Sequence, residues 1–305
     1  MKKPNYKKTI IVLFVMAIFI SPVIILHAEN KVAILKSADT PDFNAVRNGF
    51  MSVFFEEFEE FDCQNDINTA KRRMAIISSE NFSAILAIGT IAAQAAIEDK
   101  PQGLILATMV QNPDTLSSEA VNLSVIGMYP PLDSMFDKIK SLNVANLGIL
   151  LNPDENGQYL ERLRVAASRK NINIISQEVN SPRLVPAVFQ QIQDQIDAFM
   201  FLTDSIYSMK DSIDFILQTC TQGKIVTIAP TSSLVAQGAF LSISSDYVEI
   251  GRMAGQMIMD HFSNKRLPLF REPSSVLISY NEKTARSLGI VIPQEIERDA
   301  KEVIR

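Results

Sequence analysis

The sequence predicts an α/β protein made of two Rossmann-like lobes, each a parallel sheet covered by helices. Short apolar runs alternate with amphipathic stretches along the chain beyond residue 30, which is the pattern of strands joined by helical crossovers. Two well-separated stretches, Lys31–Phe50 and Asn146–Ala166, each contain an apolar run, a polar turn and a helix-like segment. The predicted strands are also too many for one compact sheet.

The strands are predicted from short apolar runs that polar or turn-forming residues bound on both sides. They are expected at Val32–Leu35, Ala84–Ile88, Leu104–Met109, Leu123–Gly127, Leu147–Leu151, Ile172–Glu178, Ala198–Leu202, Ile225–Ile228, Phe240–Ile243 and Val276–Ser279. A weaker strand is expected near Asp62–Asp66.

The helices are predicted from apolar residues that recur at the spacing of one helix face. They are expected at Phe43–Glu59, Asn68–Ser78, Ile91–Glu98, Leu132–Ser141, Gln158–Arg169, Pro182–Gln193, Met209–Thr219, Tyr247–Phe262, Lys283–Leu288 and Gln294–Val303. Strands that helices of this length separate form parallel sheets with right-handed crossovers.

Three loop-like segments mark where the chain is expected to pass between the lobes. The first is Met128–Pro131, because its paired prolines stop regular structure. The second and third are expected near Thr231–Gly238 and Leu267–Pro273. Three crossing segments form a three-strand hinge, about which two lobes rotate with little change in their own cores.

Each lobe is then assembled from discontinuous pieces of the chain. Residues 31–127 plus 239–268 are expected to form the N-terminal lobe. Residues 128–238 plus 269–305 are expected to form the C-terminal lobe. The long helix Tyr247–Phe262 therefore returns to the first lobe.

The first 28 residues read as an export signal. Four lysines precede Thr9–Leu26, a long apolar stretch, and Ala28 ends a segment that suits cleavage. The stretch is long enough for an uncleaved membrane anchor to remain an alternative, although Pro22 favours cleavage. No cysteine lies at the junction, so a lipid-modified N-terminus is not indicated. The mature protein is expected to be soluble and outside the cytoplasm.

The charge balance argues against nucleic acid as a partner. The net charge is −5 at pH 7, and the four lysines of residues 1–28 have no acidic neighbours there, so the remainder is more acidic still. Phosphate binding needs a basic face, which such a body does not supply.

The inventory of reactive side chains also argues against metal, cofactor and enzyme chemistry. Beyond the signal, His261 is the one histidine, and Cys63 and Cys220 are the two cysteines. The cysteines fall in different predicted lobes, so they are expected to be unpaired and partly buried. The sequence has no metal-ligand spacing, P-loop, Gly-x-Gly-x-x-Gly or Gly-x-Ser-x-Gly motif.

Polar residues at strand ends are the candidate ligand contacts in the first half of the chain. Thr40 follows the first strand and either caps the next helix or also touches the ligand. Thr90 follows Gly89 at the start of a helix, where free N–H groups suit a carboxylate. A simple capping role for Thr90 stays open. Tyr129 lies in the first crossing, where it lines the cleft or covers the hinge.

The second half of the chain supplies the more polar candidates. The loop after Leu147–Leu151 contains Asn152, Glu155 and Asn156, which suit an ammonium or another polar group. Asp204 follows Ala198–Leu202, and a carboxylate at a strand end is a good ammonium partner. The alternative for both loops is helix capping with solvated charges.

Several segments resemble those of a known protein family. They are VAILKSADTPDFNAVRNGF, AIGTIAAQAA, LGILLNPDENGQYLERLRVAA, AFMFLTDS, GAFLSISSDYVEIGRMAGQMI and ISYNEKTARSLGIVIP. Over Lys31–Arg305 the chain resembles type I periplasmic substrate-binding proteins. More narrowly, it resembles the ABC-transporter substrate-binding family whose members include tryptophan- and tyrosine-binding components.

This resemblance implies a receptor that hands a small ligand to an ABC permease in the inner membrane. By family position, the ligand contacts include Thr90, Asn152, Glu155, Asn156 and Asp204. The resemblance therefore predicts a periplasmic solute-binding protein, expected to be a monomer, that captures a small ligand by hinge closure, with an amino acid as one candidate.

Two other functions stay open at this point. The same fold, held by an uncleaved N-terminus, suits a sensory receptor that presents ligand to a membrane kinase or chemoreceptor. An exported enzyme on a similar scaffold is the third reading, and the scarcity of histidine weighs against it.

Overall fold

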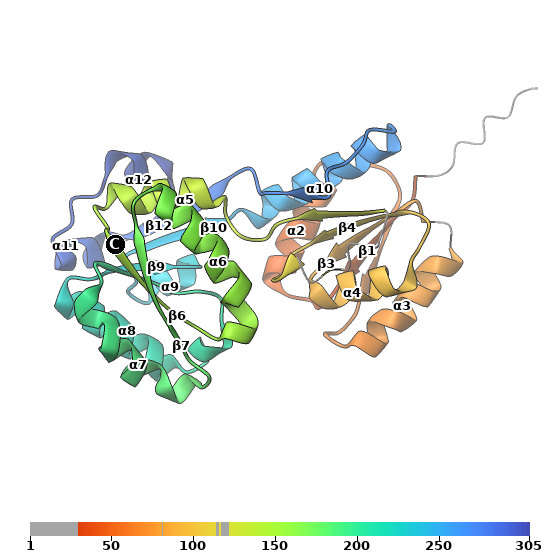
Figure 1. The fold of residues 1–305 in the computed structure, drawn as a ribbon. Helices are drawn as coiled ribbons and strands as arrows, with labels where there is room; N and C mark the ends of the chain where they lie inside the picture. The colour runs from red at the N-terminus through yellow and green to blue at the C-terminus, as the bar shows by residue number, and fades with distance from the viewer. Residues whose placement is uncertain (1–29, 81, 114–115, 117–121) are drawn as a thin grey trace, which may run out of the picture.

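The computed structural model describes residues 30–305, apart from 81, 114–115 and 117–121, and arranges them as two lobes (Figure 1). Each lobe contains one sheet with helices packed on both faces. The predicted export signal, residues 1–28, lies outside the described residues. Within the described ranges, no helix combines the length and apolar character that crossing a membrane requires.

The first lobe contains a six-stranded sheet in which all paired strands are parallel. The strand order is β11-β5-β4-β3-β1-β2. The strands are β1 (Val32–Lys36), β2 (Phe58–Asp62), β3 (Ala84–Ile88), β4 (Leu104–Thr108), β5 (Leu123–Ile126) and β11 (Phe270–Arg271). The central strands β1, β3 and β4 are buried along their whole length, as expected for a parallel sheet covered on both faces.

Two helix pairs cover the faces of this sheet. Helices α2 (Pro41–Met51) and α10 (Tyr247–Phe262) pack on one face and share one apolar core with it. Helices α3 (Ile67–Ser79) and α4 (Thr90–Asp99) cover the other face with a second core. In Figure 1 the blue helix α10 lies beside α2, from which it is distant in the sequence.

The second lobe contains a seven-stranded sheet in the order β13-β12-β10-β9-β8-β6-β7. Only the pair of β10 and β12 is antiparallel, and the remaining pairs are parallel. The strands are β6 (Asn146–Leu151), β7 (Asn173–Glu178), β8 (Ala198–Met200), β9 (Val226–Ala229), β10 (Leu241–Ser245), β12 (Val276–Asn281) and β13 (Ala300–Ile304).

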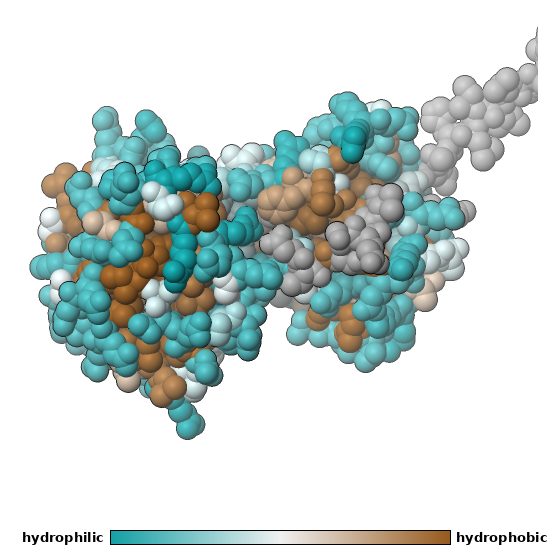
Figure 2. All heavy atoms as spheres, in the orientation of Figure 1, coloured by the Kyte–Doolittle hydropathy of each residue, from teal (hydrophilic) through white to brown (hydrophobic). Residues whose placement is uncertain are grey.

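The second sheet is also covered on both faces. One core joins it to α5 (Leu132–Ser141), α6 (Pro153–Arg169), α11 (Glu282–Leu288) and α12 (Gln294–Asp299). The opposite core joins it to α7 (Val185–Ile192), α8 (Lys210–Gly223) and α9 (Ser232–Ala236). Figure 2 shows a largely hydrophilic surface on this view, with apolar patches on both lobes.

The predicted α/β fold with two sheets and three crossings is confirmed. The chain passes between the sheets after β5, after β10 and after β11. The first crossing falls at Met128–Pro131, as predicted. The second does not fall at Thr231–Gly238, because this segment forms α9 within the second lobe.

The expected assignment of residues 239–268 to the first lobe is therefore wrong for its opening strand. Residues 241–245 form β10, which pairs with β9 and β12 in the interior of the second sheet. The crossing follows this strand, and α10 then packs on α2. Residues 270–271 pair with β5 in the first sheet, so the third crossing follows β11.

Two secondary-structure predictions also need correction. The helix predicted to reach Glu59 ends at Met51, and residues 58–62 form β2 along the open edge of β1. The last predicted helix ends at Asp299, and Ala300–Ile304 add a strand beside β12. In both places an unpaired sheet edge outweighs local helical preference, because pairing satisfies backbone groups of both strands.

The two cysteines are unpaired, as predicted, and both are completely buried in separate lobes. Burial raises the pKa of the Cys63 thiol to about 12 and also raises that of Cys220. Both side chains therefore act as small apolar residues of the core.

Helices α2 and α10 approach each other closely enough that only glycine fits at their contact. A Cβ atom on Gly251 would lie 1.9 Å from the main-chain oxygen of Val46. A Cβ atom on Gly49 would lie 1.9 Å from that of Val248. This contact attaches the returning helix α10 to the first lobe.

We therefore predict that Gly251→Ala destabilises the protein by about 1–3 kcal/mol, because the added methyl group forces the two helices apart. Gly157→Ala is a matched control in helix α6, where a Cβ atom meets nothing within 4 Å. That control is expected to be stabilising by roughly 0.5–1 kcal/mol. Urea unfolding followed by circular dichroism measures both changes, and equal midpoints for the two variants would contradict the predicted packing.

Candidate ligand-binding site

The most polar candidate residues meet at the carboxyl ends of two neighbouring strands in the second lobe. Strands β6 and β8 pair in parallel, so the loops that follow them lie side by side. The structure brings together Asn152, Glu155, Asn156 and Asp204, which we call the central cluster.

Asp204 connects the two loops through its carboxylate. Its Oδ2 atom accepts the main-chain N–H of Asn152 at 2.9 Å and the Nδ2 group of Asn156 at 2.8 Å. Its Oδ1 atom accepts the N–H of Ile206 at 3.1 Å, which caps the short 3₁₀ helix η4 (Ser205–Tyr207). The capping role is therefore present, and the same carboxylate also holds the loop after β6.

Glu155 spans the same two loops. Its Oε2 atom accepts the N–H of Ser205 at 2.9 Å, and its Oε1 atom accepts the Ser205 hydroxyl and the Nδ2 group of Asn152, the latter at 3.1 Å. Burial alone would raise the pKa of Glu155, but these hydrogen bonds lower it below its ordinary value near 4.5. The carboxylate is therefore ionised at neutral pH.

The two asparagines support the cluster from helix α6. Asn152 is the N-cap of α6, and its Oδ1 atom accepts the N–H of Asp154 at 3.1 Å. Asn156 is fully buried, and its Nδ2 group also donates to the carbonyl oxygen of Thr203 at 3.1 Å. The Oδ1 atom of Asn156 has no hydrogen-bond partner among the described residues.

Tyr129 lies beside this cluster, in the first crossing. It stacks on Tyr159 of α6, with ring centroids 3.8 Å apart and ring planes 13° apart. The Tyr129 hydroxyl is buried without a hydrogen-bond partner in the described part of the chain, although the Gln111 side chain lies close to it. Burial raises the pKa of Tyr129 to about 12, so its hydroxyl stays protonated at neutral pH.

The stacked tyrosines line a mostly apolar cavity next to the crossings. The second lobe contributes Met135, Met200 and Ile228 to its wall, and α10 contributes Tyr247. The buried hydroxyl of Ser245 also belongs to this wall and has no partner among the described residues. The cavity therefore combines an apolar lining with a few polar groups, which is typical of small-molecule sites.

The two threonines predicted as ligand contacts remain in the first lobe. Thr40 caps α2 by accepting the N–H of Phe43 at 3.3 Å. Thr90 is the first residue of α4 and follows Gly89, whose φ of +96° requires glycine. Neither threonine hydrogen-bonds to the central cluster within the described residues. The structure thus brings together four of the seven predicted residues and places Tyr129 close by.

Sequence reasoning missed Gln111 and Asn112, which follow β4 in the first lobe. The Nδ2 group of Asn112 donates to the main-chain oxygen of Glu155 at 3.1 Å, and the Nε2 group of Gln111 donates to that of Thr203 at 3.5 Å. Their position at a strand end was the available signal, since the same rule identified Asn152 and Asp204.

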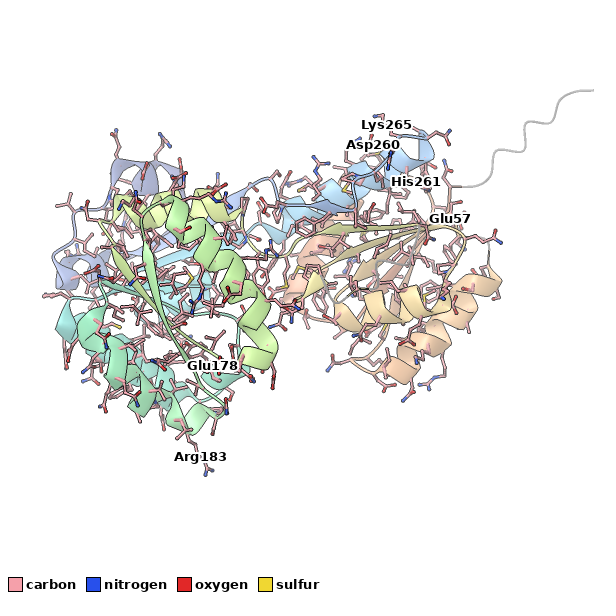
Figure 3. The ribbon with its side chains drawn as sticks, in the orientation of Figure 1. Glu57, Glu178, Arg183, Asp260, His261 and Lys265 are labelled. Carbon is pink, nitrogen blue, oxygen red and sulfur yellow. The ribbon has the colours of Figure 1, made fainter. Side chains whose placement is uncertain are left out.

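Among the described residues, the site contains neither a histidine nor a group of metal ligands. Across the described residues, no group of three or more His, Cys, Asp or Glu side chains is placed to hold a metal ion. Figure 3 shows His261 with Asp260 and Lys265 at the far end of α10, and Asp260 pairs with Lys265 at 2.7 Å. The opposite end of that helix, at Tyr247, faces the cavity.

Two α/β lobes that three chain segments connect define the fold of type I periplasmic binding proteins. The chain matches the family described as ABC transporter substrate binding protein over residues 31–304, so it belongs to that family. This is a class of binding proteins and not of enzymes.

Known relatives agree with this assignment. A tyrosine-binding protein from Clostridioides difficile is 21% identical over 284 residues, which covers 86% of this chain and 81% of that protein. The ligand-free, open structure of a substrate binding protein with adhesive properties from Clostridium difficile is 21% identical, with a TM-score of 0.77. That match covers 90% of this chain and 99% of the chain in that structure.

A further solved structure shares the fold. An ABC domain in complex with L-Trp from Streptococcus pneumoniae is 17% identical with a TM-score of 0.63. The match covers 90% of this chain and 100% of that one. The predicted fold class and family are therefore confirmed.

We predict that Glu155→Gln reduces stability at neutral pH and that this difference shrinks in acid. The pKa of Glu155 is lower in the folded protein, so its stabilisation is present above about pH 4.5 and is lost as the pH falls through the folded value. Urea unfolding of both proteins at pH 7 and near pH 3 measures the effect. An equal difference at both pH values would show that the ionised carboxylate does not hold the loops.

Proposed function

We propose that this protein is the ligand-capturing component of an ABC uptake system and that it works outside the cytoplasm. It binds an amino acid between its lobes and passes it to a membrane permease. The family assignment and the signal-like residues 1–28 support this role, and the tyrosine-binding relative supports the ligand class.

The central cluster is the observation that carries this proposal. It contains two carboxylates, Glu155 and Asp204, and neither forms a salt bridge within the described part of the chain. Each carboxylate accepts three hydrogen bonds from the protein. A carboxylate has about four acceptor positions, so each retains room for one more donor. The ammonium group of an amino acid supplies both the missing positive charge and the donors.

The surrounding groups suit the remaining parts of an amino acid. Thr90 and the N-terminus of α4 offer donors to its carboxylate from the first lobe, although the Ala92 N–H is already bonded to Ser37 Oγ at 3.0 Å. The cavity beside Tyr129 and Tyr159 offers an apolar environment to its side chain. Thr40 belongs to the same edge of the first lobe.

Capture depends on rotation of the lobes about the three crossings. A ligand that contacts both lobes binds the closed arrangement more tightly than the open one, and this difference in affinity drives closure. Bound ligand also raises the melting temperature by mass action.

A thermal-shift screen against the standard amino acids tests the proposed ligand class. At least one L-amino acid is expected to raise the melting temperature in proportion to the logarithm of its concentration, and calorimetry then gives its affinity. Sugars serve as the contrasting panel, because they carry no ammonium group. A shift with sugars alone would overturn the amino-acid assignment.

For the amino acid so found, we predict that Asp204→Asn weakens binding by roughly 2–5 kcal/mol, because the ammonium loses a partly buried charged partner. The amide keeps the size of the side chain and one acceptor oxygen. Asp194→Ala changes an exposed carboxylate outside the cluster and serves as the control. Titration calorimetry measures both, and unchanged affinity for Asp204→Asn would remove this role.

A further inference from the structure

The loop after β4 reaches from the first lobe to the central cluster at two points. Asn112 donates to the main-chain oxygen of Glu155 at 3.1 Å, and Gln111 donates to that of Thr203 at 3.5 Å. Both acceptors belong to the second lobe, one in the first turn of α6 and the other just before Asp204. These bonds therefore cross between the lobes at the candidate site.

We propose that Gln111 and Asn112 form an interlobe clasp, a pair of positioning residues that holds the lobes together at the central cluster. This proposal goes beyond the proposed function, because it concerns contacts between the lobes themselves and not contacts with the ligand. The two side chains supply neutral amide donors, so the clasp introduces no charge into the site.

The acceptors of the clasp are carbonyl oxygens, which have a second lone pair to offer. Thr203 illustrates this, because its carbonyl oxygen accepts both Gln111 and the Nδ2 group of Asn156. The clasp therefore does not compete for the carboxylates of Glu155 and Asp204. Those charged acceptors stay available for a ligand while the lobes are already in contact.

The clasp is strong enough to favour the arrangement in which the lobes touch, but not strong enough to fix the lobes in it. One neutral hydrogen bond shifts a two-state ratio by about fivefold. The Asn112 bond has ordinary length, whereas the Gln111 bond lies beyond the usual range and is the weaker one. Loss of Asn112 should therefore change the ligand-free ratio more than loss of Gln111.

A separate contact holds the lobes on the side of the crossings. The guanidinium of Arg162, on α6, lies 5.7 Å from the centre of the Phe270 ring, on β11 of the first sheet. Tyr129 stacks on Tyr159 of the same helix. Because these contacts do not involve Gln111 or Asn112, removing the clasp opens the lobes about the crossings and does not detach them.

Small-angle X-ray scattering of the ligand-free protein tests the clasp, with molecular mass measured on the same sample to exclude association. Asn112→Asp preserves the shape of the side chain but replaces its donor with a carboxylate that repels the Glu155 carbonyl. We expect a larger radius of gyration for this variant. The separate variant Asn112→Gln keeps an amide donor, so its radius of gyration should equal that of the wild type.

Gln94→Ala is the matched control, because Gln94 is an exposed amide on α4 of the same lobe, and its scattering should equal that of the wild type. If Asn112→Asp does not fold by circular dichroism, the double change Q111A with N112A takes its place with the same expectation. Scattering curves that superimpose for wild type and clasp variant would overturn the proposal. The experiment needs no ligand, so this failure would leave the proposed function standing.

Discussion

The Asp204 carboxylate is the interaction on which the arrangement of the candidate site depends. It accepts the main-chain N–H of Asn152, the side-chain amide of Asn156 in α6, and one main-chain donor from its own loop. The parallel pairing of β6 and β8 places these loops together, and the carboxylate then fixes their relative position. A neutral side chain with a single acceptor oxygen cannot accept all three donors with the same geometry.

Helix α6 contacts the central cluster, the first crossing and the first sheet through successive side chains. Glu155, Tyr159 and Arg162 follow one another along one face of the helix, because residues three and four apart lie above each other. The first joins the central cluster, the second stacks on Tyr129 in the first crossing, and the third contacts Phe270 of the first sheet. One helix therefore connects the central cluster to the crossings between the lobes.

The sequence was sufficient where a local pattern decides the outcome. Buried strands such as Ala84–Ile88 and strand-end residues such as Asp204 follow from short-range composition, and their positions were predicted. It was insufficient where pairing with a strand elsewhere in the sheet determines the secondary structure. Ala300–Ile304 is an example, because it becomes a strand by pairing with the unpaired backbone groups of β12. Gln111 and Asn112 also follow a strand, so the local pattern could have identified them, but it does not reveal that their acceptors lie in the other lobe.

The two lobes meet at the central cluster through neutral carbonyl acceptors and not through the carboxylates. Burying the carboxylates of Glu155 and Asp204 without a cation would cost several kcal/mol, because charge is costly to remove from water. The first lobe instead contacts the carbonyl oxygens of Glu155 and Thr203 through amides. These interlobe hydrogen bonds thus leave the carboxylates of Glu155 and Asp204 uninvolved. In the proposed function the ammonium of the ligand supplies a positive charge to these carboxylates.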